Sequence, residues 1–351
     1  MDECRTGNKY NGMMSLRISS IFVILVGSAF GSFFPLMCSR YSFLKLPPYF
    51  FFFCKYFGSG VIVATAFIHL LYPASNALSD DCLGAVWLAY PYAYAICMIT
   101  LFALFFCEIM AFRVIERKTN ADYSPSHFGT EGTLVQKDEE DSSNENKTGF
   151  SVNPDLSQRY PSHYAHAQVH QDPEAIGTHL EDIYKEGYYG QLLNVFVLEF
   201  GVVVHSVFVG LTLAVAGEEF KTLYAVIMFH QLFEGLGLGA RIAAIYWPKD
   251  KRATPWLLAL AYAITTPIAI AIGLGVRTTF PTESKTSLIT NGIFDSISAG
   301  ILLYAGLIEV MAHEFLFSNE FKLPNGLGRM ILAFIIMCFG TGIMALLGKW
   351  A

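Results

Sequence analysis

Long apolar runs alternate with short polar or charged connections along most of this chain. A helix that crosses a bilayer needs about 20 mostly apolar residues, and the chain contains eight runs of about that length. The runs cover approximately residues 16–38, 49–72, 85–111, 190–216, 221–247, 256–277, 290–315 and 327–348. The pattern therefore predicts an all-α polytopic membrane protein with eight transmembrane helices.

One connection differs from the others because it is long and strongly polar. Residues 119–186 contain 13 Asp and Glu, four Lys and Arg, and many Ser, Asn and Pro. A segment of this composition buries too little apolar surface to fold alone, so we expect a largely disordered loop. It separates an N-terminal tail at 1–15 and three helices within 16–118 from five helices within 187–351.

The distribution of Lys and Arg between the two sets of short loops predicts the orientation. Cytoplasmic loops carry an excess of these residues, which favours two extracellular termini and a cytoplasmic 119–186 loop. Ten basic residues would be cytoplasmic and three extracellular: Arg40, Lys45, Arg113, Arg117, Lys118, Lys249, Lys251, Arg252, Lys322 and Arg329 against Lys221, Arg277 and Lys285. Cys4 and Cys82 would then both face the oxidising side, where either a disulfide or two free thiols can exist.

Composition supports the membrane class and excludes other classes. Hydrophobic residues make up 54% of the chain and charged residues 15%, whereas soluble chains carry about 25% charged residues. The net charge is −6 and there is no basic tract, so a nucleic-acid partner is not expected. The seven Cys show no C-x-x-C spacing, which argues against a thiolate zinc knuckle or a redox pair.

Ionisable residues inside predicted spans are costly to bury and are therefore candidates for function. The fourth run contains His205 and Ser206, and the fifth contains His230, Gln231 and Glu234. His230 and Glu234 share one helix face because they are four residues apart. At about 1.5 Å per residue, His205, His230 and Glu234 all lie roughly 13–20 Å from the outer end, close to mid-membrane.

Two imidazoles and one carboxylate form a ligand set that suits Zn²⁺, and also Fe²⁺ and other late divalent ions. Gln231 and Ser206 could supply further oxygens or hold water. For a single histidine, an interhelical hydrogen bond is the structural alternative, but the matched depth of His205, His230 and Glu234 favours a metal site. The set is not saturated with charge, which suits an ion that is a transported substrate rather than a cofactor, because conduction needs binding that is tight enough for entry and weak enough for release.

Further titratable residues could line a path to and from this site. His69 in the second run could be a ligand on the outer side, with an interhelical hydrogen bond as the alternative. Glu309 and His313 are four residues apart on the inner half of the seventh run and could form an exit station. We expect Asp295 near the start of the seventh run, where it could instead cap the helix.

The polar loop contains its own group of histidines. His163, His166 and His170 are spaced by three and four residues, and His179 follows them. One turn of helix would align the first three for weak zinc capture. The alternative is a merely polar tract.

The motifs of the fourth and fifth runs resemble those of ZIP (Zrt/Irt-like) metal transporters, closest to the fungal and plant zinc-uptake members. The resemblance covers nearly the whole chain and rests mainly on His205-Ser206-Val207-Phe208-Val209-Gly210 and His230-Gln231-Leu232-Phe233-Glu234-Gly235. Residues 65–71 and Ser298-Ala299-Gly300 give weaker support. The resemblance implies eight spans, outward termini, a His-bearing loop after the third span, and metal movement toward the cytoplasm.

The chain departs from the family pattern at two positions. Some members carry one acid a turn beyond the fourth-span His and another before a Pro in the sixth span, and these carboxylates bridge two metals. Val209 and Thr266 occupy the matching places, Thr266 directly before Pro267. The departure predicts one central ion, with water completing its coordination.

The expected function is that of a multi-pass plasma-membrane transporter that moves Zn²⁺ toward the cytoplasm. Ferrous iron or a broad set of divalent ions is the alternative cargo, and a homodimer is compatible with the chain. A membrane metalloenzyme is not favoured, because no second His follows His313-Glu314 to complete H-E-x-x-H. A non-transporting metal sensor would bind the ion without flux.

Overall fold

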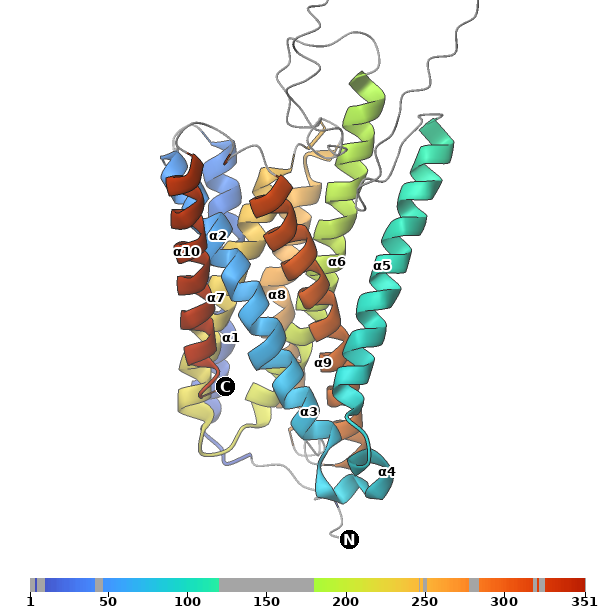
Figure 1. Ribbon diagram of the computed structural model, residues 1–351. Coiled ribbons are helices and arrows are strands. Elements are labelled where there is room, and N and C mark those ends of the chain that lie inside the picture. The colour runs from blue at the N-terminus through green and yellow to red at the C-terminus, as the bar shows by residue number, and fades with distance from the viewer. Residues whose placement is uncertain are drawn as a thin grey trace, which may run out of the picture. The chain divides into compact units, whose positions relative to one another are not determined.

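The computed structural model describes residues 4, 10–41, 47–119, 180–245, 247–248, 251–277, 284–317, 321 and 326–350. Within these residues, eight helices are long and apolar enough to cross a membrane (Figure 1), which confirms the number of spans expected. The chain divides into two compact units, one formed by Met1–Ile109 with Tyr188–Ala351 and the other by Met110–Gly187. The candidate site lies in the first unit.

The elements follow one another as helices joined by short connections, apart from the 120–179 segment, which lies outside the described residues. The first part comprises α1 (Met14–Arg40), α2 (Pro48–Ala64), the π-helix η2 (Thr65–Leu71), α3 (Tyr72–Leu78), the 3₁₀ turn η3 (Asp81–Leu83), α4 (Ala85–Leu88) and α5 (Tyr92–Thr119). The second part comprises α6 (Leu180–Val215), α7 (Phe220–Ala244), α8 (Thr254–Gly275), α9 (Lys285–Tyr304), the π-helix η7 (Ala305–Phe317) and α10 (Gly326–Leu347).

The third span begins later than the apolar pattern predicts. The expected run 85–111 is divided into the short α4 and the long α5 by a bend at Tyr90 followed by Pro91. Pro91 has no N–H to donate, and the residue before a proline is disfavoured in the helical conformation. The chain therefore changes direction here before it enters the span.

Helix α7 packs between α1 and α2 through backbone contacts that only glycine allows. Both α1 and α2 contact α7, and α2 also lies beside α10 (Figure 1). A Cβ atom on Gly237 would lie 2.9 Å from the Cα of Gly58 on α2, and a Cβ atom on Gly239 would clash with the carbonyl oxygen of Ser32 on α1. Small residues permit this close approach in membrane bundles, so α7 and its polar residues are held inside the bundle.

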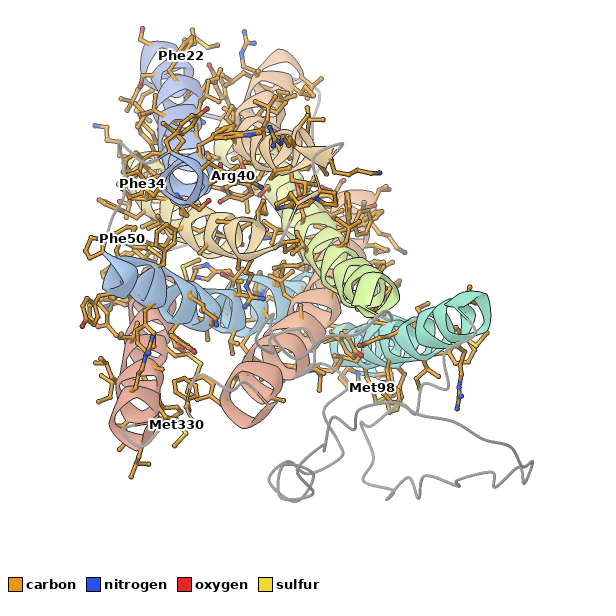
Figure 2. All side chains as sticks on the ribbon, turned by 90° about the horizontal axis from the view of Figure 1, so that it is seen from above. Phe22, Phe34, Arg40, Phe50, Met98 and Met330 are labelled. Atoms are coloured by element: carbon orange, nitrogen blue, oxygen red, sulfur yellow. A yellow bond between two sulfur atoms is a disulfide. The ribbon has the colours of Figure 1, made fainter. Side chains whose placement is uncertain are left out.

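Large apolar side chains project from the outer faces of the spans. Figure 2 shows Phe22 on α1 and Met98 on α5 pointing away from the neighbouring helices, and they are 61% and 51% exposed. Soluble proteins rarely expose apolar surface on this scale. An apolar exterior over helices that satisfy their own backbone hydrogen bonds is what a lipid environment requires.

One end of the bundle is joined by a buried arginine and a disulfide. The guanidinium of Arg17, in the first turn of α1, is fully buried and donates five hydrogen bonds of 2.6–3.2 Å. The acceptors are the carbonyl oxygens of Gly12, Leu213, Ala214 and Ala216 and the side-chain oxygen of Asn11. The last carbonyls of a helix have no intrahelical partner, so Arg17 caps α6 and joins it to α1. Cys4 and Cys82 form a disulfide, one of the two states left open by the sequence.

Candidate metal site

The helices α6 and α7 bring the histidines and the glutamate of the two motifs together. They are consecutive and joined by the short connection 216–219. The rings of His205 on α6 and His230 on α7 have centroids 5.7 Å apart. Residues His205, His230 and Glu234 are 3%, 3% and 0% exposed, so the site predicted from two separate motifs is one buried location.

Most polar atoms of this site lack a hydrogen-bond partner among the described residues. These atoms are both ring nitrogens of His205, Nε2 of His230, Oε1 of Gln231 and both carboxylate oxygens of Glu234. An unsatisfied buried polar group costs about 1–3 kcal/mol. Such groups are rare in native proteins and require an explanation, and a metal ion or ordered water would satisfy them.

Gln231 and Ser206 link the two helices at the same level. Nε2 of Gln231 donates a hydrogen bond of 3.4 Å to Oγ of Ser206, and the hydroxyl of Tyr262 on α8 donates one of 2.6 Å to the backbone oxygen of Gln231. These bonds hold α6, α7 and α8 together around the histidines. The side-chain oxygen Oε1 of Gln231 remains available to an ion or to its bound water.

The spacing of His230 and Glu234 suits two ligands of one ion better than a hydrogen-bonded pair. Nε2 of His230 is 3.5 Å from Oε2 of Glu234, which is longer than an ordinary N–H···O bond of about 2.7–3.2 Å. Two ligands of a tetrahedral zinc, each about 2.0–2.2 Å from the metal, lie about 3.3–3.5 Å apart. Within the described residues, no three His, Cys, Asp or Glu side chains converge enough to hold an ion, so binding requires the side chains to move together.

His69 extends this polar cluster toward α10. Its ring lies edge-to-face against the ring of His230, with centroids 4.7 Å apart, and its Nε2 donates a hydrogen bond of 2.9 Å to the carbonyl oxygen of Met344. The interhelical hydrogen bond considered from the sequence is therefore present. A carbonyl oxygen only accepts, so Nε2 carries the proton and Nδ1 keeps a lone pair for an ion. His69 lies in η2, and π-helical segments are frequent at functional sites.

Asp295 does not cap a helix, and this expectation from the sequence was wrong. Helix α9 begins at Lys285, where the side chain of Ser284 accepts from the backbone N–H of Ser287. Asp295 therefore lies well inside α9, and its Oδ1 is 3.6 Å from Nδ1 of His205. The apolar pattern begins too late to reveal this, because the polar residues 285–287 and 290–291 make the first two turns of α9 resemble a loop.

Two further acids in the spans have different environments. Glu108 on α5 accepts a hydrogen bond from the hydroxyl of Tyr304 on α9, which gives it a structural partner. Glu199 on α6 is 5% exposed, and its Oε2 has no hydrogen-bond partner in the described part of the chain. It lies six residues before His205 on the same helix, about 9 Å along the axis.

The remaining predicted residues are those of the seventh span and of the polar loop. Glu309 and His313 belong to η7, but their side chains lie outside the described residues. The loop histidines His163, His166 and His170 also lie outside the described residues.

Comparison with known proteins places the chain in a family. The family model ZIP Zinc transporter matches residues 14–348, which include every candidate span from Met14 to Leu347. The chain is 43% identical to zinc-regulated transporter 2 of Saccharomyces cerevisiae, in an alignment that covers 100% of the chain and 98% of that protein. It is 42% identical to zinc-regulated transporter 1 of the same yeast, over 98% of the chain and 90% of that protein. It is 38% identical to zinc-regulated transporter 1 of Schizosaccharomyces pombe, over 98% and 88%. The chain therefore belongs to the ZIP zinc transporter family.

Proposed function

We propose that this protein takes up Zn²⁺ across the plasma membrane toward the cytoplasm, through a site formed by His205, His230 and Glu234. Its family consists of transporters rather than enzymes. The observation that carries the residue assignment is the set of buried nitrogen and oxygen atoms on α6 and α7 that lack hydrogen-bond partners among the described residues. Such atoms are available to an ion without first breaking an existing hydrogen bond.

The ligand types support zinc as the cargo. Imidazole and carboxylate bind Zn²⁺ readily, although they also accept Fe²⁺. The relatives at 43%, 42% and 38% identity are named zinc-regulated transporters, which favours zinc over iron. With Val209 and Thr266 in place of the bridging acids, the site is proposed to hold one ion.

The path of the ion uses polar groups on both sides of this site. With both termini extracellular, His69 lies on the outer side and its free Nδ1 can pass an ion to His230, whose ring it contacts. Glu309 and His313 are the proposed exit station on the cytoplasmic side, and Gln231 with Ser206 supports the ion or its water in between. The residues 119–186 form the proposed cytoplasmic loop, with His163, His166 and His170 as weak acceptors.

The chemistry of transport then follows from the ligand set. Histidine and glutamate must be deprotonated to bind a metal, so binding releases any protons that they carry. Conduction also requires that the ion leave, so the site must not bind it too tightly. Mixed neutral imidazole and carboxylate ligands meet this condition better than a thiolate site would.

Uptake of radioactive zinc by the purified protein in sealed liposomes tests this function. We expect zinc to accumulate inside only with the protein present, and excess unlabelled zinc to compete more strongly than ferrous iron. Specific binding without accumulation would instead indicate a sensor. Stronger competition by iron would overturn the choice of cargo.

A further inference from the structure

We propose that Asp295 is a fourth protein ligand of the transported ion, so that the site has two histidines, one glutamate and one aspartate. This inference rests on the proposed zinc site of α6 and α7 and extends it to α9. Asp295 comes from a helix that neither motif includes.

The spacing between Asp295 and His205 repeats that of His230 and Glu234, the pair proposed as ligands on α7. Oδ1 of Asp295 is 3.6 Å from Nδ1 of His205, and Oε2 of Glu234 is 3.5 Å from Nε2 of His230. Both distances exceed a hydrogen bond and approach the separation of about 3.3–3.5 Å between two ligands of one tetrahedral zinc. Each histidine thus has one carboxylate at about the distance that separates two ligands of the same zinc ion.

The separation of the two imidazole rings allows the two pairs to share one ion. With Zn–N bonds of about 2.0–2.1 Å, each ring centroid lies about 3.2 Å from the metal, and two rings in tetrahedral positions have centroids about 5.2 Å apart. The observed separation of His205 and His230 is 5.7 Å. Small side-chain movements would therefore bring the two pairs onto one Zn²⁺.

Charge gives a second reason for another acid at this depth. Two neutral imidazoles and Glu234 leave a bound Zn²⁺ with one uncompensated positive charge in a buried site. Isolated buried charges are strongly disfavoured unless they are paired. The carboxylate of Asp295 is 14% exposed, and its Oδ1 has no hydrogen-bond partner among the described residues. Ionised Asp295 would neutralise the complex without giving up an existing hydrogen bond of that oxygen.

The test introduces a sulfur atom at this position and asks whether the metal binds it. In the full chain with His163, His166, His170 and His179 changed to Ala, Asp295→Cys is loaded with one equivalent of Zn²⁺ and examined by zinc X-ray absorption. A Zn–S distance of about 2.3 Å is easily separated from Zn–N and Zn–O distances of about 2.0–2.2 Å. Phe294→Cys is the matched control, because Phe294 is 42% exposed and packs on Phe208.

We expect one sulfur ligand in Asp295→Cys and none in Phe294→Cys or in the parent chain. We also expect Asp295→Asn to weaken zinc binding by about 100-fold or more, exceeding the range of a residue that only orients a ligand. Absence of sulfur in a zinc-loaded Asp295→Cys protein, or affinity within about tenfold of the parent in Asp295→Asn, would overturn the proposal. A loss of between about tenfold and 100-fold in Asp295→Asn, with no sulfur ligand in Asp295→Cys, would also overturn the proposal and leave Asp295 as a residue that orients His205.

Failure of the underlying zinc site gives a different result. If His205, His230 and Glu234 do not form the site, the parent chain keeps its bound zinc when His230 is changed to Ala. If only the role of Asp295 is wrong, the parent loses zinc on His230→Ala while Asp295→Asn retains it. Calorimetry on these variants separates the two outcomes.

Discussion

Two buried polar clusters in this protein differ in how many of their polar atoms have hydrogen-bond partners. The Arg17 cluster, formed by Arg17 and the end of α6, uses all five N–H donors of the guanidinium. The metal-site cluster, formed by His205, His230 and Glu234, leaves most of its nitrogen and oxygen atoms without partners in the described part of the chain. Both clusters are almost completely buried, so burial alone does not separate them.

The difference distinguishes a structural polar group from a functional one. A buried charge with all its donors satisfied stabilises the helices that supply the acceptors. A buried group without partners costs free energy in the empty protein, and a ligand that binds there recovers it. We therefore expect the Arg17 cluster to control stability and the metal-site cluster to control transport, and the following experiments test that separation.

The largest effect is expected from His230→Ala and Glu234→Gln. Each change should lower zinc uptake in liposomes by about 100-fold or more, because one of few protein ligands is lost at a depth where water substitutes poorly. Glu234→Gln should change the free energy of unfolding by no more than about 1 kcal/mol, because neither carboxylate oxygen has a hydrogen-bond partner among the described residues. His230→Ala also loses the ring contacts with His69 and His205 and should cost about 2–3 kcal/mol. Uptake is compared at equal amounts of reconstituted protein.

Phe229→Leu is the matched control for these two changes. Phe229 lies on the same helix, next to His230, but is 46% exposed and stacks on Phe233. Its substitution should leave uptake within about twofold of the native value, as expected for an exposed position away from the site. Normal uptake by folded His230→Ala would remove the metal-site cluster from the transport path.

A loss of stability is expected from Arg17→Met. Removing the guanidinium breaks its hydrogen bonds to three carbonyl oxygens at and just after the end of α6, and breaking a buried charged network costs about 3–5 kcal/mol. Arg17→Lys should recover part of this loss, because an ammonium group has three donors rather than five. Thermal unfolding in detergent measures the effect, with Ile18→Ala at a 44% exposed neighbour as the control.

Zinc uptake per folded molecule of Arg17→Lys should fall far less than uptake by His230→Ala. A transport defect in Arg17→Lys as large as that in His230→Ala, with unfolding unchanged, would contradict the proposed division between the clusters.

A smaller effect is expected from zinc itself. A ligand that binds only the folded state stabilises it by about 2.7 kcal/mol at 100 times its dissociation constant. Native protein and Arg17→Lys should both gain thermal stability with zinc, whereas Glu234→Gln should gain little at the same concentration. Equal stabilisation of all three would show that the measured zinc binds elsewhere, for example at the histidines of the 119–186 segment.

Much of this architecture is predictable because membrane spans impose a simple pattern. The need for about 20 apolar residues per span predicts the eight helices, and the motifs around His205 and His230 predict which two carry the site. The structure confirms the number of spans and brings His205, His230 and Glu234 to one location. These side chains come to one level because α6 and α7 are consecutive helices joined by a short connection.

Other features depend on tertiary packing that the apolar pattern does not contain. A cap at Asp295 is one of the two roles that the sequence allows, because the apolar pattern places the start of α9 too late. The contact of Asp295 with His205 joins two helices far apart in the chain, which the pattern does not contain. The hydrogen bond of His69 likewise requires α10 to lie beside η2. The role of Arg17 was not predicted, because its five acceptors come mostly from backbone oxygens, which carry no sequence signal.

The smallest effect is expected from replacing His163, His166 and His170 together with Ala. These residues lie in the polar 119–186 segment, outside the apolar runs that predict the spans, so we do not expect them to set the barrier to the ion. Turnover in liposomes should stay within about twofold of the native value, as expected for substitutions away from the proposed site. In cells, the same variant should alter the abundance of the protein at the surface when zinc is high, measured by surface labelling.

The control replaces the same three residues with Asn, which keeps polarity but removes the imidazole, and should behave like Ala. If flux in liposomes were lost with both replacements, the loop would contain an essential ligand of the path, and the two buried clusters would no longer account for transport and stability on their own.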